Sequence, residues 1–285
     1  MVFSLKMNGQ LLRLDRPRVM GIVNVTPDSF YAGSRCEQVP ALMMRVGEMI
    51  AEGADILDIG ACSTRPGSDS VSEKEELSRL MPALEAIRKS YPEVLLSVDT
   101  FRAEVARRAV EEFGVAMIND ISGGDMDSRM FETAARCQVP YVLSHIQGRP
   151  KDMQQAPVYD DLMTDICRYL AERVQRLRAL GLNDIVVDPG FGFGKTLAQN
   201  YELLRRLPDL SLLGAPLMVG LSRKSMICRL LDVQPEEALN GTTVLNALAL
   251  KGGAHILRVH DVAPAVQCVK LYMAYQNIDS CFPTC

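Results

Sequence analysis

Six short apolar segments of this 285-residue chain run into polar residues at the point where a buried β-strand would stop. They are MGIVNVTPDSF at 20–30, DILDIGACSTRPG at 55–67, LLSVDTF at 95–101, DIVVDPGFGFGK at 184–195, and MVGLSRKS at 218–225 with ILRVHD at 256–261. Polar groups at the carboxyl ends of buried parallel strands serve ligands more often than packing. The segments therefore predict an enzyme with its site on one rim, and their groups suit a phosphorylated heterocycle.

The segment from Asp188 to Thr196 is close to a phosphate-binding P-loop but breaks that motif at its first position. GxxxxGK[ST] needs glycine where Pro189 stands, and proline has no N–H to offer a phosphate. The glycines instead allow the backbone to approach a flat ligand beside Phe193. The Asp188 carboxylate would match an adjacent N–H and exocyclic NH2, as on a pterin or guanine ring. Capping of the next helix by Asp188 is the structural alternative.

Further acceptors and donors stand at neighbouring strand ends. Asp99 ends the third predicted strand, Asn119 and Asp120 end the fourth, and Lys224 follows the seventh. Each has a structural alternative, since Asp99 could cap a helix and Lys224 could be a solvated charge. Together they favour recognition of a polar aromatic ring over capping.

A second group of residues suits an anion. Arg258 and His260 are two positions apart on the eighth predicted strand, so both are expected to face inward. The planar fork of an arginine binds phosphate well, and the Asn24 amide oxygen could reach Mg2+. The segment Ser63 to Gly67 completes this anion-binding arc. The role of His145, after the fifth strand, stays open.

Eight apolar runs alternating with helical segments predict a (β/α)8 barrel rather than a doubly wound sheet. A hairpin turning at Asn8-Gly9, within residues 1–15, is expected to cap the amino-terminal face of the barrel. One domain over 1–285 with a tail at 277–285 is predicted. The runs are 19–23, 56–59, 94–98, 115–118, 141–143, 185–187, 217–221 and 256–259, and the clearest helical segments are 73–89, 102–113, 162–180 and 262–275.

Composition excludes several classes of protein. A net charge of -4 gives no electrostatic footprint for nucleic acid, and no apolar run is long enough for a membrane span. The amino terminus has no continuous apolar stretch of the kind that a signal peptide needs. Eight scattered cysteines lack a zinc-binding spacing, which predicts reduced thiols in a cytoplasmic protein. Pairing of Cys281 with Cys285 stays open.

The chain resembles the dihydropteroate synthase family through GIVNVTPDSF, STRPG, SVDT, IND, DPGFGFGK, GLSRKS and RVHDV, in that order over nearly its whole length. The resemblance implies a homodimeric (β/α)8 barrel that joins 6-hydroxymethyl-7,8-dihydropterin diphosphate to 4-aminobenzoate with the help of Mg2+. It implies an SN1-like course without a protein nucleophile, in which Asp99, Lys224, Arg258 and His260 carry the catalysis.

The resemblance also implies a role for each matching residue. The pterin contacts would be Asp99, Asn119, Asp188 and Lys224, and the diphosphate and metal contacts would be Asn24, Arg258 and His260. Thr64, Arg65, Pro66 and Ser222 would lie near aminobenzoate and the leaving group, with Phe193 lining the pocket.

Three positions depart from the family pattern. Cys62 stands where the family often has Glu, Ala32 stands where an acid is common, and Ser144 replaces a Met on the fifth strand. The nearest alternative is a pterin-dependent methyltransferase acting with a corrinoid, which would not need the anion-binding residues. A catalytically silent pterin-binding paralogue should have lost them. A P-loop phosphotransferase is opposed by Pro189.

Overall fold

Eight parallel strands form the wall of a barrel, and each lies within or overlaps one of the eight predicted apolar runs. The computed structural model describes residues 2–25, 35–62, 71–148 and 157–277. The hydrogen-bonded order is β8-β7-β6-β5-β4-β3-β10-β9, and a parallel bridge between Val187 and Leu217 joins the two ends. The predicted (β/α)8 barrel is confirmed. The strands are β3 (Arg18–Asn24), β4 (Ile56–Gly60), β5 (Leu96–Asp99), β6 (Met117–Asp120), β7 (Tyr141–Ser144), β8 (Ile185–Asp188), β9 (Met218–Val219) and β10 (Ile256–Val259).

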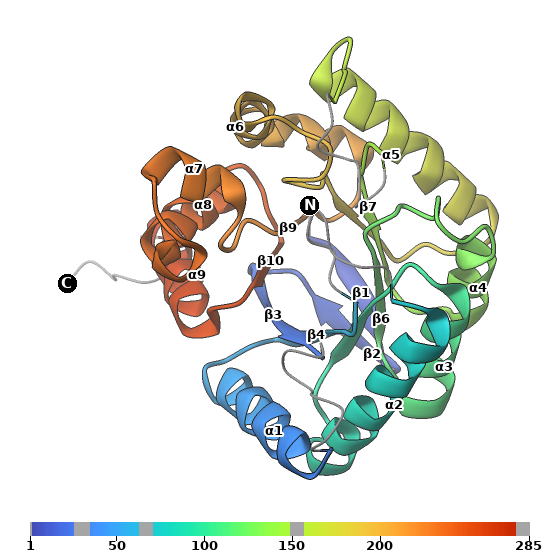
Figure 1. The fold of residues 1–285 in the computed structure, drawn as a ribbon. Coiled ribbons are helices and arrows are strands. Elements are labelled where there is room, and N and C mark those ends of the chain that lie inside the picture. Colours follow the sequence, from blue (N-terminus) through green and yellow to red (C-terminus); the bar gives the residue numbers. More distant parts are fainter. Residues whose placement is uncertain (1, 26–34, 63–70, 149–156, 278–285) are drawn as a thin grey trace.

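Helices surround the wall on its outer side (Figure 1). The four helical segments that periodicity predicts correspond to α2, α3, α5 and α9. Local signals set the helix ends: the Ser72 hydroxyl caps α2 by accepting from the Glu75 N–H, and Gly114 ends α3 with a φ of 61°. The helices are α1 (Arg35–Ala51), α2 (Glu73–Ser90), α3 (Ala103–Phe113), α4 (Met130–Cys137), α5 (Leu162–Ala179), α6 (Leu197–Arg205), α7 (Ser225–Leu231), α8 (Leu239–Lys251) and α9 (Val262–Gln276), with 3-10 turns η1 (Leu207–Leu213) and η2 (Pro235–Glu237).

The inside of the barrel is filled at its amino-terminal end by an apolar layer. Because successive strand residues face opposite sides, every second residue of the wall points inward. The layer is closed to water, since each residue that the wall strands contribute to it is at most 1% exposed. Its strand residues are Met20, Ile56, Met117, Val142, Val186, Met218 and Ile256.

The predicted amino-terminal hairpin is confirmed and closes this end of the barrel. Strands β1 (Ser4–Met7) and β2 (Gln10–Arg13) pair antiparallel across Asn8 and Gly9, whose φ angles are 49° and 78°. Positive φ at both central residues is what a type I′ turn requires. Leu5 and Met7 pack into the apolar layer, and the hairpin crosses the middle of the ring of strands in Figure 1.

We predict that Leu5→Ala lowers the free energy of unfolding by about 2–5 kcal/mol. Leu5 is 1% exposed, so its removal leaves a cavity where the hairpin packs into the barrel. Leu11→Ala is the matched control in the same hairpin, since Leu11 is 70% exposed. Urea denaturation followed by circular dichroism measures both. Equal losses in the two variants would contradict the role of the hairpin as a plug.

Candidate active site

Above the apolar layer, four neighbouring strands carry polar atoms that face inward and lack partners. Each of these atoms belongs to a residue two positions after an inward-facing apolar residue. Because every second side chain of a strand faces the same side, it too points into the barrel. Within the described ranges no hydrogen-bond partner reaches Asp58 Oδ1, Ser97 Oγ, Asn119 Oδ1 or Ser144 Oγ. Leaving one such buried atom unpaired costs about 1–3 kcal/mol. Four together mark a polar layer whose partners come from outside the protein, as water or as a ligand.

Arg258 ties this polar layer together. Its Nε donates to Asp58 Oδ2 at 2.7 Å, and its Nη2 donates to Asp99 Oδ2 at 2.6 Å. The Asn119 amide donates to the same Asp58 oxygen at 2.9 Å, which fixes its orientation. Burial alone would lower the pKa of Arg258, but the carboxylates of Asp58 and Asp99 raise it. The residue predicted to hold diphosphate therefore contacts the buried carboxylates of Asp58 and Asp99. Among the described residues, none accepts a hydrogen bond from its Nη1.

Asp99 is a site residue and does not cap a helix. Its carboxylate contacts Arg258, and the residue before α3 is Arg102, which makes no side-chain cap. Burial raises the pKa of Asp99 to about 7, although the Arg258 charge opposes the shift. Asp120, in contrast, serves the fold, because it accepts from the Tyr141 hydroxyl at 2.6 Å and from two backbone N–H groups.

Asp188 is also directed into the barrel. One oxygen accepts from the Gly190 N–H at 2.8 Å, and the side chain is 6% exposed. Burial raises the pKa of Asp188, with Lys224 opposing the shift. The helix-capping alternative is contradicted, since α6 is capped by Thr196 in a capping box with Gln199.

Lys224 and the loop between β8 and α6 complete the side of the site that is predicted to bind the ring. The Lys224 ammonium donates to the Phe191 carbonyl oxygen and lies 4.3 Å from the centroid of the Phe193 ring. Burial lowers the pKa of Lys224 to about 8, and Asp188 opposes this shift. A side chain at Gly192 would come within 3.3 Å of the Lys224 stem, so glycine is needed for this close approach. Lys224 is thus no solvated surface charge.

The side of the site that is predicted to bind an anion includes His260, Ser222 and Asn24. His260 Nδ1 lies 3.0 Å from Ser222 Oγ, and the Arg45 guanidinium donates to the His260 carbonyl oxygen at 2.6 Å. Asn24 ends β3 and is exposed at the rim. The predicted contacts Thr64, Arg65 and Pro66, and the departure at Ala32, lie outside the described residues, as do Cys281 and Cys285.

Asn24 offers the rim an oxygen that could contact a magnesium ion carried by a substrate. Across the described ranges, no group of three or more His, Cys, Asp or Glu could hold a metal. Mg2+ commonly keeps several waters and binds through one or two protein oxygens together with substrate phosphates. The exposed Asn24 amide oxygen meets that requirement.

Asp58 is the site residue that the sequence did not single out. It lies within an apolar run, is fully buried, and receives hydrogen bonds from Arg258 and Asn119. A carboxylate inside a buried strand was the available signal, because such a charge is costly without partners.

Of the family departures, Ser144 adds a buried hydroxyl beside Asp188, and the Cys62 thiol contacts Arg102 at 3.5 Å.

A barrel with this polar layer defines a pterin-binding enzyme, and comparison with known proteins agrees. The model of the pterin binding enzyme family matches residues 20–260. The dihydropteroate synthase of Escherichia coli K12 is 44% identical over 93% of this chain and 94% of its own. The dihydropteroate synthase of Yersinia pestis, solved with a sulfonamide drug, is 43% identical with a TM-score of 0.89, covering 96% of this chain and all of its own.

A third relative was solved with 4-aminobenzoic acid. This Xanthomonas albilineans dihydropteroate synthase is 42% identical with a TM-score of 0.88, covering 97% of this chain and 99% of its own. The chain belongs to the dihydropteroate synthase family, which makes it a transferase. The relatives favour this family over the corrinoid-linked methyltransferases.

We predict that Asp188→Asn weakens binding of a pterin by roughly tenfold or more, because an amide offers one acceptor where the carboxylate offers two. Asp120→Asn is the matched control, since Asp120 is equally buried but bonded to the protein. Titration calorimetry with 6-hydroxymethylpterin measures both affinities. Undiminished affinity in a folded Asp188→Asn variant would exclude Asp188 as the ring anchor.

Proposed function

We propose that this chain condenses 6-hydroxymethyl-7,8-dihydropterin diphosphate with 4-aminobenzoate, giving 7,8-dihydropteroate and pyrophosphate. The observation that carries the proposal is the polar layer on β4 to β7, whose atoms lack a partner among the described residues and which adjoins the Asp188 carboxylate of β8. Identity of 44% to a dihydropteroate synthase over nearly the full chain supports the same activity.

The polar layer matches the edges of a pterin ring. The Asp188 carboxylate accepts from the ring N–H and the adjacent exocyclic amine, and Asn119 Oδ1 accepts a further ring hydrogen. The Lys224 ammonium uses one donor on Phe191 and has two more for ring acceptors. Phe193, stacked under Lys224, offers an apolar face beside the ring.

Catalysis follows from separating charges. The C–O bond between the pterin methylene carbon and the diphosphate breaks, and its electron pair leaves with pyrophosphate. Positive charge then spreads over the pterin, beside the carboxylates of Asp99 and Asp188. The amine nitrogen of 4-aminobenzoate forms the new C–N bond and loses a proton. Fixed charges that favour both fragments lower the barrier without a protein nucleophile.

The leaving group is held at the opposite side of the rim. Arg258, through its remaining N–H groups, and His260 donate to the pyrophosphate oxygens as their charge grows. Mg2+ bound with the diphosphate would neutralise part of that charge, and Asn24 would supply a protein oxygen. Ser222 orients the His260 ring by its contact with Nδ1.

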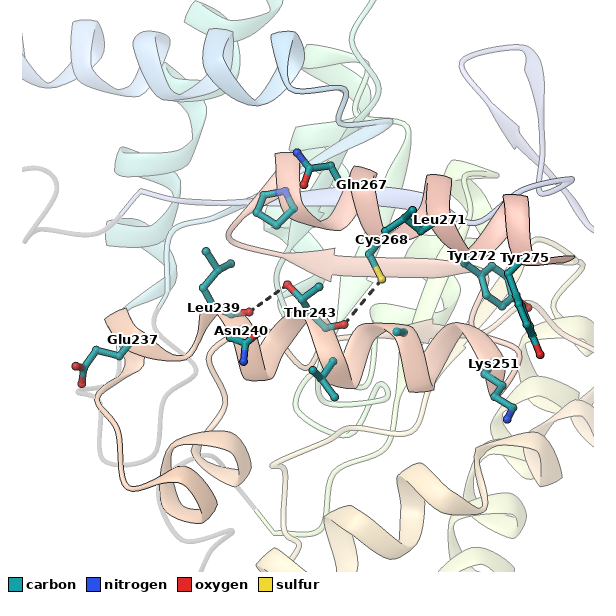
Figure 2. A pocket seen from close by; sticks show the side chains of 13 residues that line it. Glu237, Leu239, Asn240, Thr243, Lys251, Gln267, Cys268, Leu271, Tyr272 and Tyr275 are labelled. Atoms are coloured by element: carbon teal, nitrogen blue, oxygen red, sulfur yellow. Dashed lines mark hydrogen bonds between the residues drawn. The ribbon is translucent and has the colours of Figure 1, made fainter. Parts of the chain in front are cut away.

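We also infer that two copies of the chain associate through the outer face of α8 and α9. Both helices keep apolar residues on the side that faces away from the barrel, where Leu271 is 74% and Val244 is 51% exposed. Figure 2 shows the hollow between the two helices, with Glu237 at one end and Lys251 at the other. A twofold axis across this face would place Glu237 of each copy near the partner copy's basic end.

Other parts of the chain agree with a cytoplasmic enzyme, which we propose as its location. The five cysteines with described side chains (62, 137, 167, 228 and 268) are all free thiols. Over the ranges that the structure covers, no helix is long and apolar enough to cross a membrane.

We predict that the protein releases pyrophosphate and forms dihydropteroate when given both substrates and Mg2+. Arg258→Ala should lower turnover by a factor of about 100 to 1,000, as loss of an oxyanion donor does. It should also weaken pterin binding, because Asp58 and Asp99 lose their partner. His260→Gln keeps that ion pair, so it should slow turnover while pterin affinity stays the same. No dihydropteroate from folded wild-type protein would disprove the proposed activity.

We predict that Val244→Asp with Leu271→Asp converts the dimer to a monomer, because each change buries a carboxylate in an apolar contact. Leu212→Asp is the control, since Leu212 is 87% exposed on η1. Analytical ultracentrifugation gives the mass of each variant. A wild-type monomer, or a dimer unaffected by the double change, would rule out this face.

A further inference from the structure

Lys195 is a buried cation that the proposed reaction does not use. It follows the glycine-rich loop and is 2% exposed. Its Nζ contacts Gly190 O at 2.9 Å, Phe193 O at 3.1 Å and His145 Nδ1 at 3.0 Å. An ammonium has three hydrogens to donate, so these three acceptors satisfy it completely. Nothing remains for a phosphate, which disposes of the P-loop alternative.

The loop that Lys195 holds is the one that carries the ring-binding groups. The Gly190 N–H donates to Asp188, Phe191 O accepts from Lys224, and Phe193 lies under Lys224. The same loop is pressed against the end of β7: a Cβ on Gly190 would come within 1.9 Å of the His145 carbonyl oxygen. A displacement of this loop would therefore move every group on its inner side.

His145 is the third acceptor and is neutral. Burial lowers the pKa of His145 well below 6.5, and the Lys195 charge adds to this shift. Nδ1 can then accept from the ammonium only if the ring proton is on Nε2. The ring packs edge-on against Tyr169 of α5 at 4.8 Å, which holds its orientation.

We propose that Lys195 and His145 form a positioning pair that fixes the loop of residues 189–194 for pterin binding, and that the pair exchanges one proton with solvent by a change of His145 tautomer. When the ammonium loses a proton, the amine keeps two N–H groups for Gly190 O and Phe193 O. His145 then loses its Nε2 proton, gains one on Nδ1 and donates it to the amine. The pair has then lost one proton in total, and the contacts of Lys195 with Gly190 O, Phe193 O and His145 are all kept. The proposal rests on the proposed pterin site.

The electrostatics place this exchange near neutral pH. Burial lowers the pKa of Lys195 from 10.5 to about 7, with Asp188 opposing and Lys224 adding to the shift. Burial raises the pKa values of Tyr159 and Tyr169, which stay neutral in this range. Lys224 titrates nearby, so wild type must be compared with variants. The charged and titratable groups that face the pair are Asp188, Lys224, Arg173, Tyr159 and Tyr169.

The same shift makes stability depend on pH. Above about pH 7 the folded protein has released the Lys195 proton, whereas an unfolded lysine keeps its proton to about pH 10.4. Between these values the unfolded chain binds more protons, so the contribution of Lys195 to stability rises with pH.

The first test is spectroscopic and uses the free wild-type protein. The chain has only three histidines, so 15N labelling of histidine gives few ring signals, and His145→Gln assigns one of them. We expect the His145 tautomer to change from Nε2–H to Nδ1–H as pH rises from 6 to 9. Lys195→Met should abolish the change. One tautomer throughout in wild type would overturn the shared proton.

The second test measures positioning. Lys195→Met should weaken 6-hydroxymethylpterin binding by roughly tenfold, as loss of a charge-assisted hydrogen bond does, and leave pyrophosphate binding unchanged. Lys195→Gln retains two N–H donors and should recover part of the affinity. Lys89→Met, at the exposed end of α2, is the control. Full pterin affinity in Lys195→Met would refute the positioning role. Failure of wild type to bind pterin would instead count against the proposed function.

Discussion

The contact of the Arg258 guanidinium with two buried carboxylates is the interaction on which the candidate site depends. Asp58, Asp99 and Arg258 come from three strands, and their two ion pairs offset the cost of burying these groups in the barrel. Removing one partner of such a buried pair typically costs about 3–5 kcal/mol. Asn119 joins the group through Asp58, so the amide that we propose to bind the pterin ring is oriented by the same group of charges. The polar layer is therefore assembled as one unit.

The apolar layer beneath gives these charges their strength. Leu5 and Met7 of the hairpin, together with the inward residues of the strands, exclude water from the amino-terminal half of the barrel. In such surroundings a hydrogen bond is stronger than in water, and an unpaired polar atom is more costly. A rigid ring that brings its own donors relieves that cost, whereas a flexible apolar ligand would not. The plug far from the rim thus contributes to selectivity at the rim.

Much of the fold was predictable because a strand buried on both faces gives a continuous apolar run, and Asn8-Gly9 specifies its turn. The site was predictable wherever a polar residue ended such a run. Asp58 was missed because its partner, Arg258, lies 200 residues away and the barrel alone brings them together. Asp120 was misassigned although it adjoins Asn119, since neighbouring strand residues face opposite sides and Asp120 faces Tyr141. The alternation of side chains along the strand therefore distinguishes the inward-facing Asn119 from the outward-facing Asp120.

The loop between β8 and α6 shows how a sequence close to a P-loop serves another purpose. Three of its N–H groups are already used: Gly190 donates to Asp188, Gly192 donates to Asn200, and Phe193 donates to Gly190 O. Its carbonyl oxygens face cations instead, with Lys224 on the inner side and Lys195 on the outer side. Positive φ at the glycines allows successive carbonyls to point to opposite sides. Because the loop works through oxygens, Pro189, which lacks an N–H, disturbs nothing.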